Sequence, residues 1–345
     1  MSYKYLIPAL LFLLLFFPAA KNDPAWAGSF PFFWGVALDG YPITTEKLAL
    51  MAQEIRVKPQ MALFYLQWPK SPVQGDFPKN SLEAIWRQGA VPCLSWEPMF
   101  IDNGREITIA AERILQGEYD PYLRRMTNGV NSWGKQVIIR FAHEMNLERY
   151  HWGTDKTGYG PQSSEKYKEM FRYLVTFFRK AGVNNVWWAF CPNSESIPNP
   201  AGSPEAAWNR PEAYYPGDDF VDLLGMDGYN WGTTQTLEKH GWQSNWRSFK
   251  EIFSPLYQVL KTLAPQKPLL VFEIATTHQG GDKKQWIGEA LTTSREWGLL
   301  GIIWFQANKE QDWRINSQND YSYVSQLQSS ISPEPQQWFS RTQSR

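Results

Sequence analysis

Cysteine, histidine and net charge are scarce in this chain of 345 residues. It has two Cys and four His, and its 34 acidic residues balance 34 basic ones. A neutral chain lacks the basic surface that nucleic-acid binding requires. So few histidines, with no cysteines at ligand spacing, give no support for a metal site. Cys93 and Cys191 fall in predicted strands that are not neighbours, so we expect two buried free thiols rather than a disulfide.

A phosphate-binding glycine motif and an apolar run long enough to cross a membrane are also missing. No glycine-rich fingerprint follows the first predicted strand, which counts against a nucleotide partner. The N-terminal apolar run, Tyr5 to Phe17, is shorter than the roughly 20 residues of a membrane-spanning helix. With Lys4 before it and Ala25-Trp26-Ala27 after it, the run predicts a signal peptide over residues 1–27. We expect a secreted, periplasmic or cell-surface protein, which contacts a membrane only if the signal stays uncleaved.

Aromatic side chains are abundant instead, with 18 Trp, 16 Tyr and 20 Phe. Many of them are expected in the core. Trp also stacks flatly on an apolar ring face while its N–H stays in water, and sugars present such faces. The composition therefore favours a carbohydrate ligand.

Strand and helix patterns alternate from Phe32 through most of the chain. The predicted strands are Phe33–Leu38, Met61–Leu66, Val91–Ser95, Val137–Phe141, Val186–Phe190, Leu223–Met226, Leu269–Phe272 and Gly301–Phe305. The predicted helices are Thr45–Arg56, Ser81–Arg87, Thr108–Leu115, Ser164–Lys180, Ser248–Leu263 and Lys283–Trp297. This α/β alternation predicts a single (β/α)8 TIM barrel over residues 28–331 rather than an open doubly wound sheet. Residues 332–345 are polar, contain two prolines and are expected to be disordered.

The end of the fourth predicted strand is the centre of the candidate site. Four polar residues follow its apolar run within a short stretch: Arg140, His143, Glu144 and Asn146. The strand period of two predicts that Arg140, Ala142 and Glu144 share one face. Polar groups at the C-terminal end of a buried strand are costly to desolvate unless they serve a site, and a barrel places its chemistry at that end. A structural Arg–Glu pair is the simpler alternative.

A second carboxylate, Glu273, ends the apolar seventh strand in the same way. Carboxylates on the fourth and seventh strands face each other across the mouth of a barrel. Glycoside hydrolysis needs such a pair, because one acid protonates the leaving oxygen and one carboxylate attacks the anomeric carbon.

Other strand ends carry acidic and aromatic side chains. We interpret Glu97 as a partner of Arg140 rather than a third catalytic carboxylate. Asp39 and Asp227 either touch substrate or serve as capping or turn residues. Trp188 and Trp304 are expected to form a platform or wall of the cleft.

The motif Arg140-x-x-His143-Glu144-Met145-Asn146, followed by Trp152-Gly153, resembles the acid/base motif of glycoside hydrolase family 26. The segments at 271–273 and 227–231 and the late Trp304 are similar to that family's later strand ends. The likeness spans residues 32–330. It implies a (β/α)8 barrel and endo-acting hydrolysis of a β-linked polysaccharide with retention of configuration, by a monomer without a cofactor.

The resemblance also implies roles for individual residues. Glu144 matches the acid/base and Glu273 the nucleophile. By analogy with related barrels, Arg140 and the Tyr229 hydroxyl hold Glu273 as a carboxylate, whereas burial against Trp152 and the charge of Glu273 raise the pKa of Glu144. The expected substrate-binding residues are His143, Trp152, Tyr229, Trp304, Trp96, Asn146 and Trp188.

One departure from the family leaves the sugar open. Many of its mannanases have Gly directly after the Asn, where this chain has residues 147–151 before Trp152. Mannan ranks first as the family's commonest substrate, with mixed-linkage β-1,3-1,4-glucan and β-1,3-xylan as alternatives. A secreted polysaccharide-binding barrel without catalysis is a second class, but it has no need of both carboxylates. A sugar-phosphate enzyme is disfavoured because the Ala275–Asp282 loop contains no Lys or Arg before Lys283.

Overall fold

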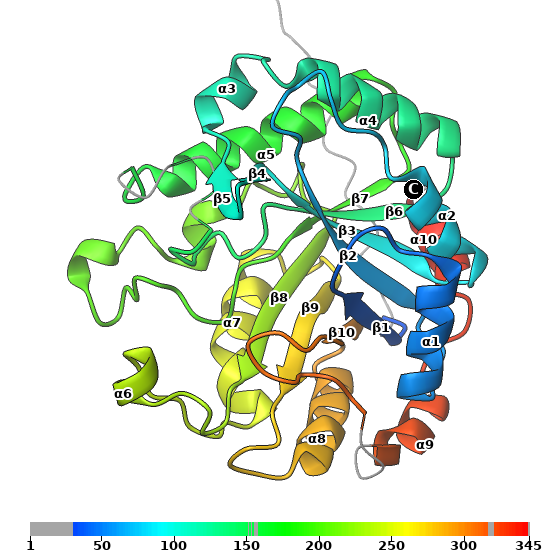
Figure 1. The fold of residues 1–345 in the computed structure, drawn as a ribbon, viewed down its shortest axis with the longest axis vertical. Helices are drawn as coiled ribbons and strands as arrows, with labels where there is room; N and C mark the ends of the chain where they lie inside the picture. Colours follow the sequence, from blue (N-terminus) through cyan, green and yellow to red (C-terminus); the bar gives the residue numbers. More distant parts are fainter. Residues whose placement is uncertain (1–29, 151, 153, 155–157, 317–320, 344–345) are drawn as a thin grey trace, which may run out of the picture.

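The computed structural model describes residues 30–343 apart from 151, 153, 155–157 and 317–320. Eight parallel strands close into a barrel in the order β1-β10-β9-β8-β7-β6-β3-β2 (Figure 1). They are β1 (Phe33–Leu38), β2 (Met61–Gln67), β3 (Val91–Glu97), β6 (Val137–Phe141), β7 (Val186–Phe190), β8 (Leu223–Asn230), β9 (Leu269–Thr276) and β10 (Gly301–Phe305). The predicted (β/α)8 barrel is confirmed.

Four strands have the predicted bounds, and four extend further at their C-terminal ends. β1, β6, β7 and β10 match because each is a short apolar run that is buried throughout, as parallel strands covered on both faces are. β2 and β3 continue to Gln67 and Glu97, and β8 and β9 continue to Asn230 and Thr276. Since the extensions end in polar side chains, they bring polar groups to the barrel mouth.

Most helices pack around the outside of the barrel (Figure 1). They are α1 (Thr45–Ile55), α2 (Lys79–Arg87), α3 (Ala111–Leu115), α4 (Asp120–Trp133), α5 (Ser163–Lys180), α6 (Leu237–His240), α7 (Phe249–Leu263), α8 (Lys283–Glu296), α9 (Tyr323–Gln328) and α10 (Pro335–Gln343), with the 3-10 turns η1 (Pro204–Ala206) and η2 (Pro211–Tyr214). Side chains fix some of the helix starts: Ser248 and Glu251 form a capping box at α7, and Asp282 accepts from the Gln285 N–H at α8. In the part of the chain that the structure describes, no helix has the length and apolar character to cross a bilayer.

The connection between β3 and β6 differs from the prediction. Of the predicted helix Thr108–Leu115 only Ala111–Leu115 is helical, because the residues before it pair in an antiparallel hairpin of β4 (Met99–Asp102) and β5 (Arg105–Thr108). The sequence prediction also lacks α4, although the buried residues of this helix follow helical spacing. Pro121 lies in its first turn, where a missing N–H removes no intrahelical bond, so this proline starts the helix instead of breaking it.

The C-terminal segment forms a helix, contrary to the prediction of a disordered tail. α10 lies at the N-terminal ends of the strands, where the Phe339 ring is fully buried. Its centroid lies 6.1 Å from that of Phe33 at the start of β1 and 5.2 Å from that of Trp187 in β7. Trp338 packs beside it, with its ring centroid 5.6 Å from that of Trp187. Two aromatic anchors in an otherwise polar stretch thus close the bottom of the barrel.

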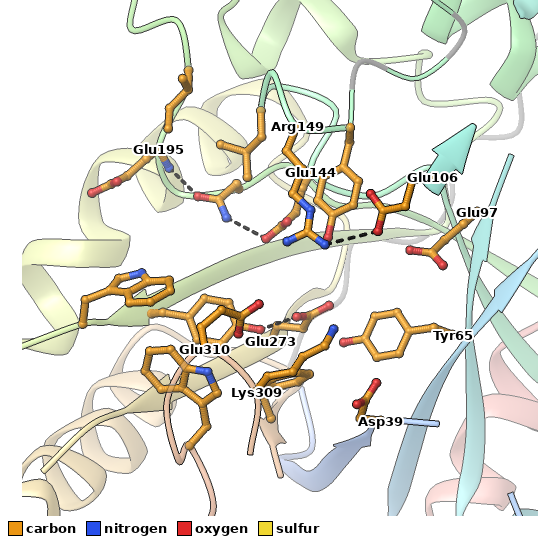
Figure 2. A pocket seen from close by; sticks show the side chains of 18 of the residues that line it. Asp39, Tyr65, Glu97, Glu106, Glu144, Arg149, Glu195, Glu273, Lys309 and Glu310 are labelled. Carbon is orange, nitrogen blue, oxygen red and sulfur yellow. Dashed lines mark hydrogen bonds and ion pairs between the residues drawn. The ribbon is translucent and has the colours of Figure 1, made fainter. Parts of the chain in front are cut away.

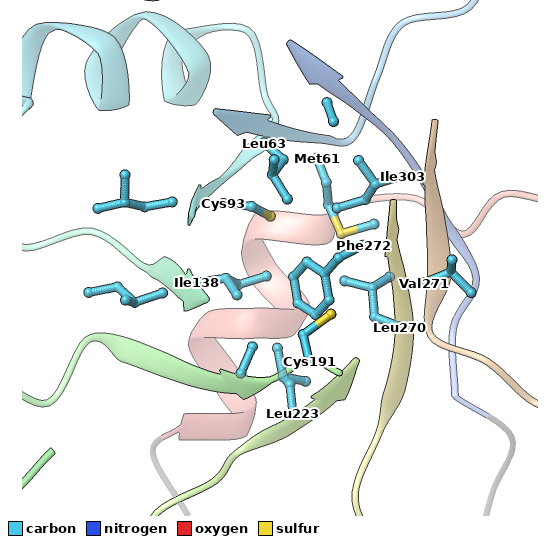
Figure 3. Close-up of a cluster of buried hydrophobic side chains, with 14 of the residues drawn as sticks. Met61, Leu63, Cys93, Ile138, Cys191, Leu223, Leu270, Val271, Phe272 and Ile303 are labelled. Atoms are coloured by element: carbon cyan, nitrogen blue, oxygen red, sulfur yellow. The ribbon is translucent and has the colours of Figure 1, made fainter. Parts of the chain in front are cut away.

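Apolar side chains fill the barrel interior below the site. Figure 3 shows Met61, Leu63, Cys93, Ile138 and Cys191 in this cluster. Both cysteines are free and buried, as predicted, and burial raises the pKa of each thiol. The predicted signal peptide, residues 1–27, lies outside the described residues, so export stays a prediction.

Candidate active site

A cleft of about 630 Å³ opens at the C-terminal ends of the barrel strands. Glu144 and Glu273 line it, together with Tyr65 of β2, Glu97 of β3 and Tyr229 of β8. In Figure 2, Glu144 and Glu273 approach the cleft from opposite walls. The structure therefore brings together the two carboxylates that the sequence singles out.

The backbone after β6 places Glu144 in an unusual conformation. Ala142 and Glu144 have φ angles of 48° and 52°, in the left-handed region that L-residues rarely occupy. The Ala142 N–H donates to the Trp96 carbonyl oxygen (3.1 Å), and the Glu144 N–H donates to the Cys191 carbonyl oxygen (2.8 Å). Such positions cost about 1–3 kcal/mol each and occur at functional sites. Because the strand ends at Phe141, the predicted alternation stops before Glu144.

Arg140 lies beneath the cleft and is fully buried. Its guanidinium donates to Asp227 Oδ2 (2.5 Å), to Ser95 Oγ (2.6 and 2.8 Å) and to Glu273 Oε1. Burial opposes its charge, but Asp227 and Glu273 together raise the pKa of Arg140. Asp227 is thus a buried partner of Arg140, which corrects the expectation of a substrate contact or turn residue.

Glu273 and Asp227 are neighbours across the β8–β9 pair. Tyr229 lies two residues beyond Asp227, on the same face of β8, and its hydroxyl donates to Glu273 Oε2. Each oxygen of Glu273 therefore accepts one hydrogen bond, from Arg140 or from Tyr229, as the analogy with related barrels implies. Charge-assisted bonds of this kind stabilise a carboxylate.

Glu144 has very different surroundings. Burial and the negative charge of Glu273 raise the pKa of Glu144 to about 7, although a hydrogen bond from Asn193 and the charge of Arg140 oppose the shift. The Asn193 Nδ2 group donates to Glu144 Oε1 at 2.6 Å. Glu144 therefore holds its proton to a higher pH than an ordinary glutamic acid does.

His143 is buried behind the two carboxylates. Its Nε2 lies 4.0 Å from Glu273 Oε1. Burial and the charge of Arg140 hold the pKa of His143 well below its usual value, so the imidazole is neutral. Trp152 donates to the His143 carbonyl oxygen (2.5 Å) and stacks on Tyr150 at 5.0 Å. Tyr150 lines the cleft and Trp152 does not, which corrects the expectation that Trp152 contacts sugar.

Asn146 also differs from its predicted role as a substrate contact. It is fully buried, and its Nδ2 donates to the carbonyl oxygens of Asn193 and Glu195, both at 3.0 Å. Its Oδ1 accepts from the Asn193 N–H at 2.8 Å. Asn146 thus fixes the loop from which Asn193 reaches Glu144.

Three predicted cleft tryptophans face the outer helices instead. Trp96, Trp188 and Trp304 are at most 3% exposed, and none of them lines the cleft. Trp188 packs against Phe178 of α5 at 5.1 Å, and Trp304 packs against Trp286 of α8 at 6.3 Å. Each lies one position out of phase with the inward-facing residues, such as Ser95 beside Trp96, so strand alternation turns its ring outward.

Glu97 is a third buried carboxylate in the cleft. It accepts a hydrogen bond from Gln67 Nε2, which corrects its predicted pairing with Arg140. Burial raises the pKa of Glu97 to about 7, with Gln67 and Arg140 opposing. Among the residues described, no group of three or more His, Cys, Asp or Glu is arranged to hold a metal ion.

Several cleft residues were not predicted as site residues. They include Tyr65, Gln67, Met99, Glu106, Arg149 and Tyr150. Strand alternation is the signal for Tyr65 and Gln67, which follow Leu63 at steps of two on β2. Met99 and Glu106 belong to the β4–β5 hairpin, whose position over the cleft has no local sequence signal. His151 lies outside the described residues.

The fold and the site define a class. A closed barrel with a buried carboxyl group of raised pKa after its fourth strand and a hydrogen-bonded carboxyl group on its seventh is the arrangement of the (β/α)8 glycosidases. Comparison with known proteins agrees. Residues 122–254 match the model of glycosyl hydrolase family 26.

Relatives by sequence carry two kinds of name. Endoglucanase H of Acetivibrio thermocellus is 35% identical over 239 residues, which are 68% of this chain and 24% of that protein. A mannan endo-1,4-beta-mannosidase of Bacillus subtilis is 27% identical over 169 residues, 44% of this chain and 43% of that protein. The chain spans less than half the length of either relative.

Solved structures share the fold. A Bacillus subtilis mannanase superimposes with a TM-score of 0.61 at 17% identity, over 89% of this chain and 91% of that one. A β-mannanase of Bacteroides ovatus gives 0.60 at 20% identity, over 87% and 89%. Over residues 122–254 the chain is thus similar to glycosyl hydrolase family 26, and it shares its fold with these mannanases.

Proposed function

We propose that the chain is an endo-acting glycoside hydrolase that cleaves a β-linked polysaccharide with retention of configuration. The observation that supports this proposal best is the contrast between the surroundings of the two carboxyl groups in the cleft. Glu273 accepts hydrogen bonds from Arg140 and Tyr229, whereas burial and the negative charge of Glu273 raise the pKa of Glu144 to about 7. Opposite environments assign opposite roles to identical side chains.

The first chemical step uses both groups. Glu273 attacks the anomeric carbon as a carboxylate while Glu144 gives its proton to the leaving oxygen, which forms a covalent glycosyl–enzyme ester. Once Glu273 is esterified, its negative charge is gone and the pKa of Glu144 falls. Glu144 then removes a proton from water, which attacks the anomeric carbon and releases Glu273. The Asn193 hydrogen bond holds Glu144 in place through both steps.

Retention of configuration makes two independent predictions, one about the distance between the two carboxyl groups and one about the anomer of the first product. A retaining pair requires carboxyl groups about 5–5.5 Å apart, whereas an inverting pair is separated by about 6.5–9.5 Å to admit water. Proton NMR of the first product should show the β-anomer. An initial α-anomer contradicts the assignment of Glu273 as nucleophile.

The backbone sugar is proposed as mannan first, following the family's mannanases. β-Glucan is the second candidate, because the relative named an endoglucanase matches more of this chain, at higher identity, than the mannosidase does. Release of reducing ends from galactomannan, barley β-glucan, β-1,3-xylan and carboxymethylcellulose should identify one preferred substrate. The Glu273→Ala variant is the matched blank. Release from none of the four by the wild type, with intact folding shown by circular dichroism, contradicts a hydrolase of these polysaccharides.

A further inference from the structure

Three tryptophans form a row that leads from the nucleophile to the rim of the cleft. Tyr229, which bonds Glu273, packs against Trp313 with a centroid distance of 5.1 Å. Trp313 meets Trp231 at 4.9 Å, and Trp231 meets Trp242 at 5.7 Å. All four rings line the cleft. The row therefore starts at the edge of the apolar core, to which Trp313 belongs, and continues along the wall of the cleft.

Exposure rises along this row. Trp313 is 1% exposed, Trp231 is partly exposed and Trp242 is 43% exposed. Of the tryptophans in the described part of the chain, Trp242 alone is classed as exposed. An indole held in water gains little from burial, so packing does not explain its position. A flat apolar face with a polar edge suits a sugar ring, which has apolar faces and polar rims.

The segment that carries Trp242 is tied to the barrel at several points. It follows α6, and the Ser244 N–H donates to the Gln235 carbonyl oxygen at 3.2 Å. The Arg247 side chain forms an ion pair with Glu195 on the facing wall. The Arg247 backbone N–H donates to Asn230 Oδ1 at 3.0 Å. Figure 2 places Glu195 at the end of the cleft opposite Asp39 and Glu97. Trp242 is thus held at one defined end of the cleft.

The floor of the row offers a polar contact as well. Trp313 Nε1 is buried and has no hydrogen-bond partner among the described residues. A buried N–H without a partner is costly, so this atom marks the buried end of the row as a place where a hydrogen-bond acceptor is missing. The exposed ring of Trp242 at the other end offers an open face that matches the apolar face of a sugar ring.

We propose that this row, Trp313-Trp231-Trp242, binds successive sugars of the polysaccharide, with Trp242 as a platform for a sugar remote from the bond that is cleaved. The proposal rests on the proposed function and adds where the substrate chain leaves the catalytic centre. It predicts that Trp242 contributes to binding of long substrates only, because a short one does not reach the rim.

Binding measured without turnover tests this dependence on length. In the Glu273→Ala background, titration calorimetry with manno- or cello-oligosaccharides, whichever series matches the preferred polysaccharide, compares the disaccharide with the hexasaccharide. Trp242→Ala should leave the disaccharide Kd unchanged and weaken hexasaccharide binding by about tenfold. Trp242→Phe should restore most of the loss. Leu237→Ala is the matched control, since Leu237 is 65% exposed on the same loop but does not line the cleft.

Two results overturn the platform. One is an unchanged hexasaccharide Kd in Trp242→Ala. The other is equal weakening at every length together with a lower melting temperature, which indicates a structural role. Neither affects the proposed function, which fails separately if the wild type cleaves no polysaccharide and the Glu273→Ala protein binds no oligosaccharide.

Discussion

The two ends of the barrel are built on opposite principles. At the C-terminal end of the strands, Arg140, Glu144 and Glu273 are buried ionisable groups. Two residues there, Ala142 and Glu144, have left-handed backbone conformations. At the N-terminal end, the rings of Phe339 and Trp187 pack together without any charge between them. Figures 2 and 3 show the same contrast, between the polar cleft and the apolar cluster.

The difference separates chemistry from stability. Buried charges and strained backbone destabilise a fold unless each charge is paired, whereas apolar burial stabilises it by about 25 cal/mol per Å². The catalytic end tolerates its polar network because the rest of the barrel supplies the stability. Substitutions at the two ends should therefore have opposite profiles, with activity lost at one end and stability lost at the other.

Glu273→Ala should have the largest effect on activity. Without the nucleophile no glycosyl–enzyme ester forms, so turnover should fall by more than about 10⁴-fold on every substrate. Reducing-end release and hydrolysis of aryl glycosides measure the loss. Substantial residual activity on any substrate removes the assignment of Glu273 as nucleophile.

Glu144→Ala should fail selectively. An aryl glycoside with a good leaving group needs little protonation, so ester formation from it should survive, while polysaccharide hydrolysis should fall by about 10²–10⁴-fold. Azide should raise the residual turnover, because a small anion attacks the ester without a general base. Equal losses on activated and natural substrates contradict the acid/base role.

Phe339→Ala tests the opposite end. Removal of a fully buried ring should lower the free energy of unfolding by about 3–5 kcal/mol, while kcat at a temperature where the protein stays folded is unchanged. Urea unfolding measures the first quantity and initial rates the second. Gln337→Ala, on the exposed face of the same helix, is the control and should change neither. A loss of kcat in the folded Phe339→Ala protein contradicts the separation of the two ends.

The sequence predicts the barrel better than it predicts the cleft, for physical reasons. Strands such as Val137–Phe141 are apolar along their whole length because both faces are covered, and that pattern is local. Whether a strand side chain points into the barrel or outward depends on its position in the two-residue alternation along the strand. Trp188 and Trp304 lie one residue out of phase with the inward positions, so they support helices instead of lining the cleft.

Contacts between distant segments are the other limit on prediction from sequence. The pairing of Arg140 with Asp227 joins residues 87 positions apart, and a shift of register on β8 sets the position of Asp227. The order of α10 depends on Phe339 reaching Phe33 across the barrel bottom. The carboxylates Glu144 and Glu273 were predictable because each comes shortly after an apolar run that indicates a buried strand, where a charge requires a reason.

Glu144→Gln should stabilise the protein, but only above acidic pH. The pKa of Glu144 is raised to about 7 in the folded protein from the ordinary 4.5 of the unfolded chain, so the folded state binds the extra proton between these limits. The stability of the wild type should therefore fall as pH rises from about 4.5 to about 7, by about 3 kcal/mol from this group. Urea unfolding of wild type and variant should agree near the acidic limit and differ above neutrality. A difference that is the same at every pH contradicts the raised pKa.

The pH dependence of activity is expected to show the smallest effect of the five predictions, but it identifies the acid most directly. kcat/KM should fall on the alkaline side as Glu144 loses its proton near pH 7, since deprotonated Glu144 has nothing to donate. Glu97 is the competing explanation, because its pKa is also raised to about 7 by burial in the same cleft. With activated aryl glycosides as substrates, kcat/KM of the Glu144→Gln variant should no longer fall on the alkaline side, whereas kcat/KM of the Glu97→Gln variant should still fall there. The reverse result moves the acid from the end of β6 to β3. His143 does not explain a limb that survives both substitutions, because burial and Arg140 hold the pKa of His143 well below its usual value and the imidazole is already neutral where activity falls.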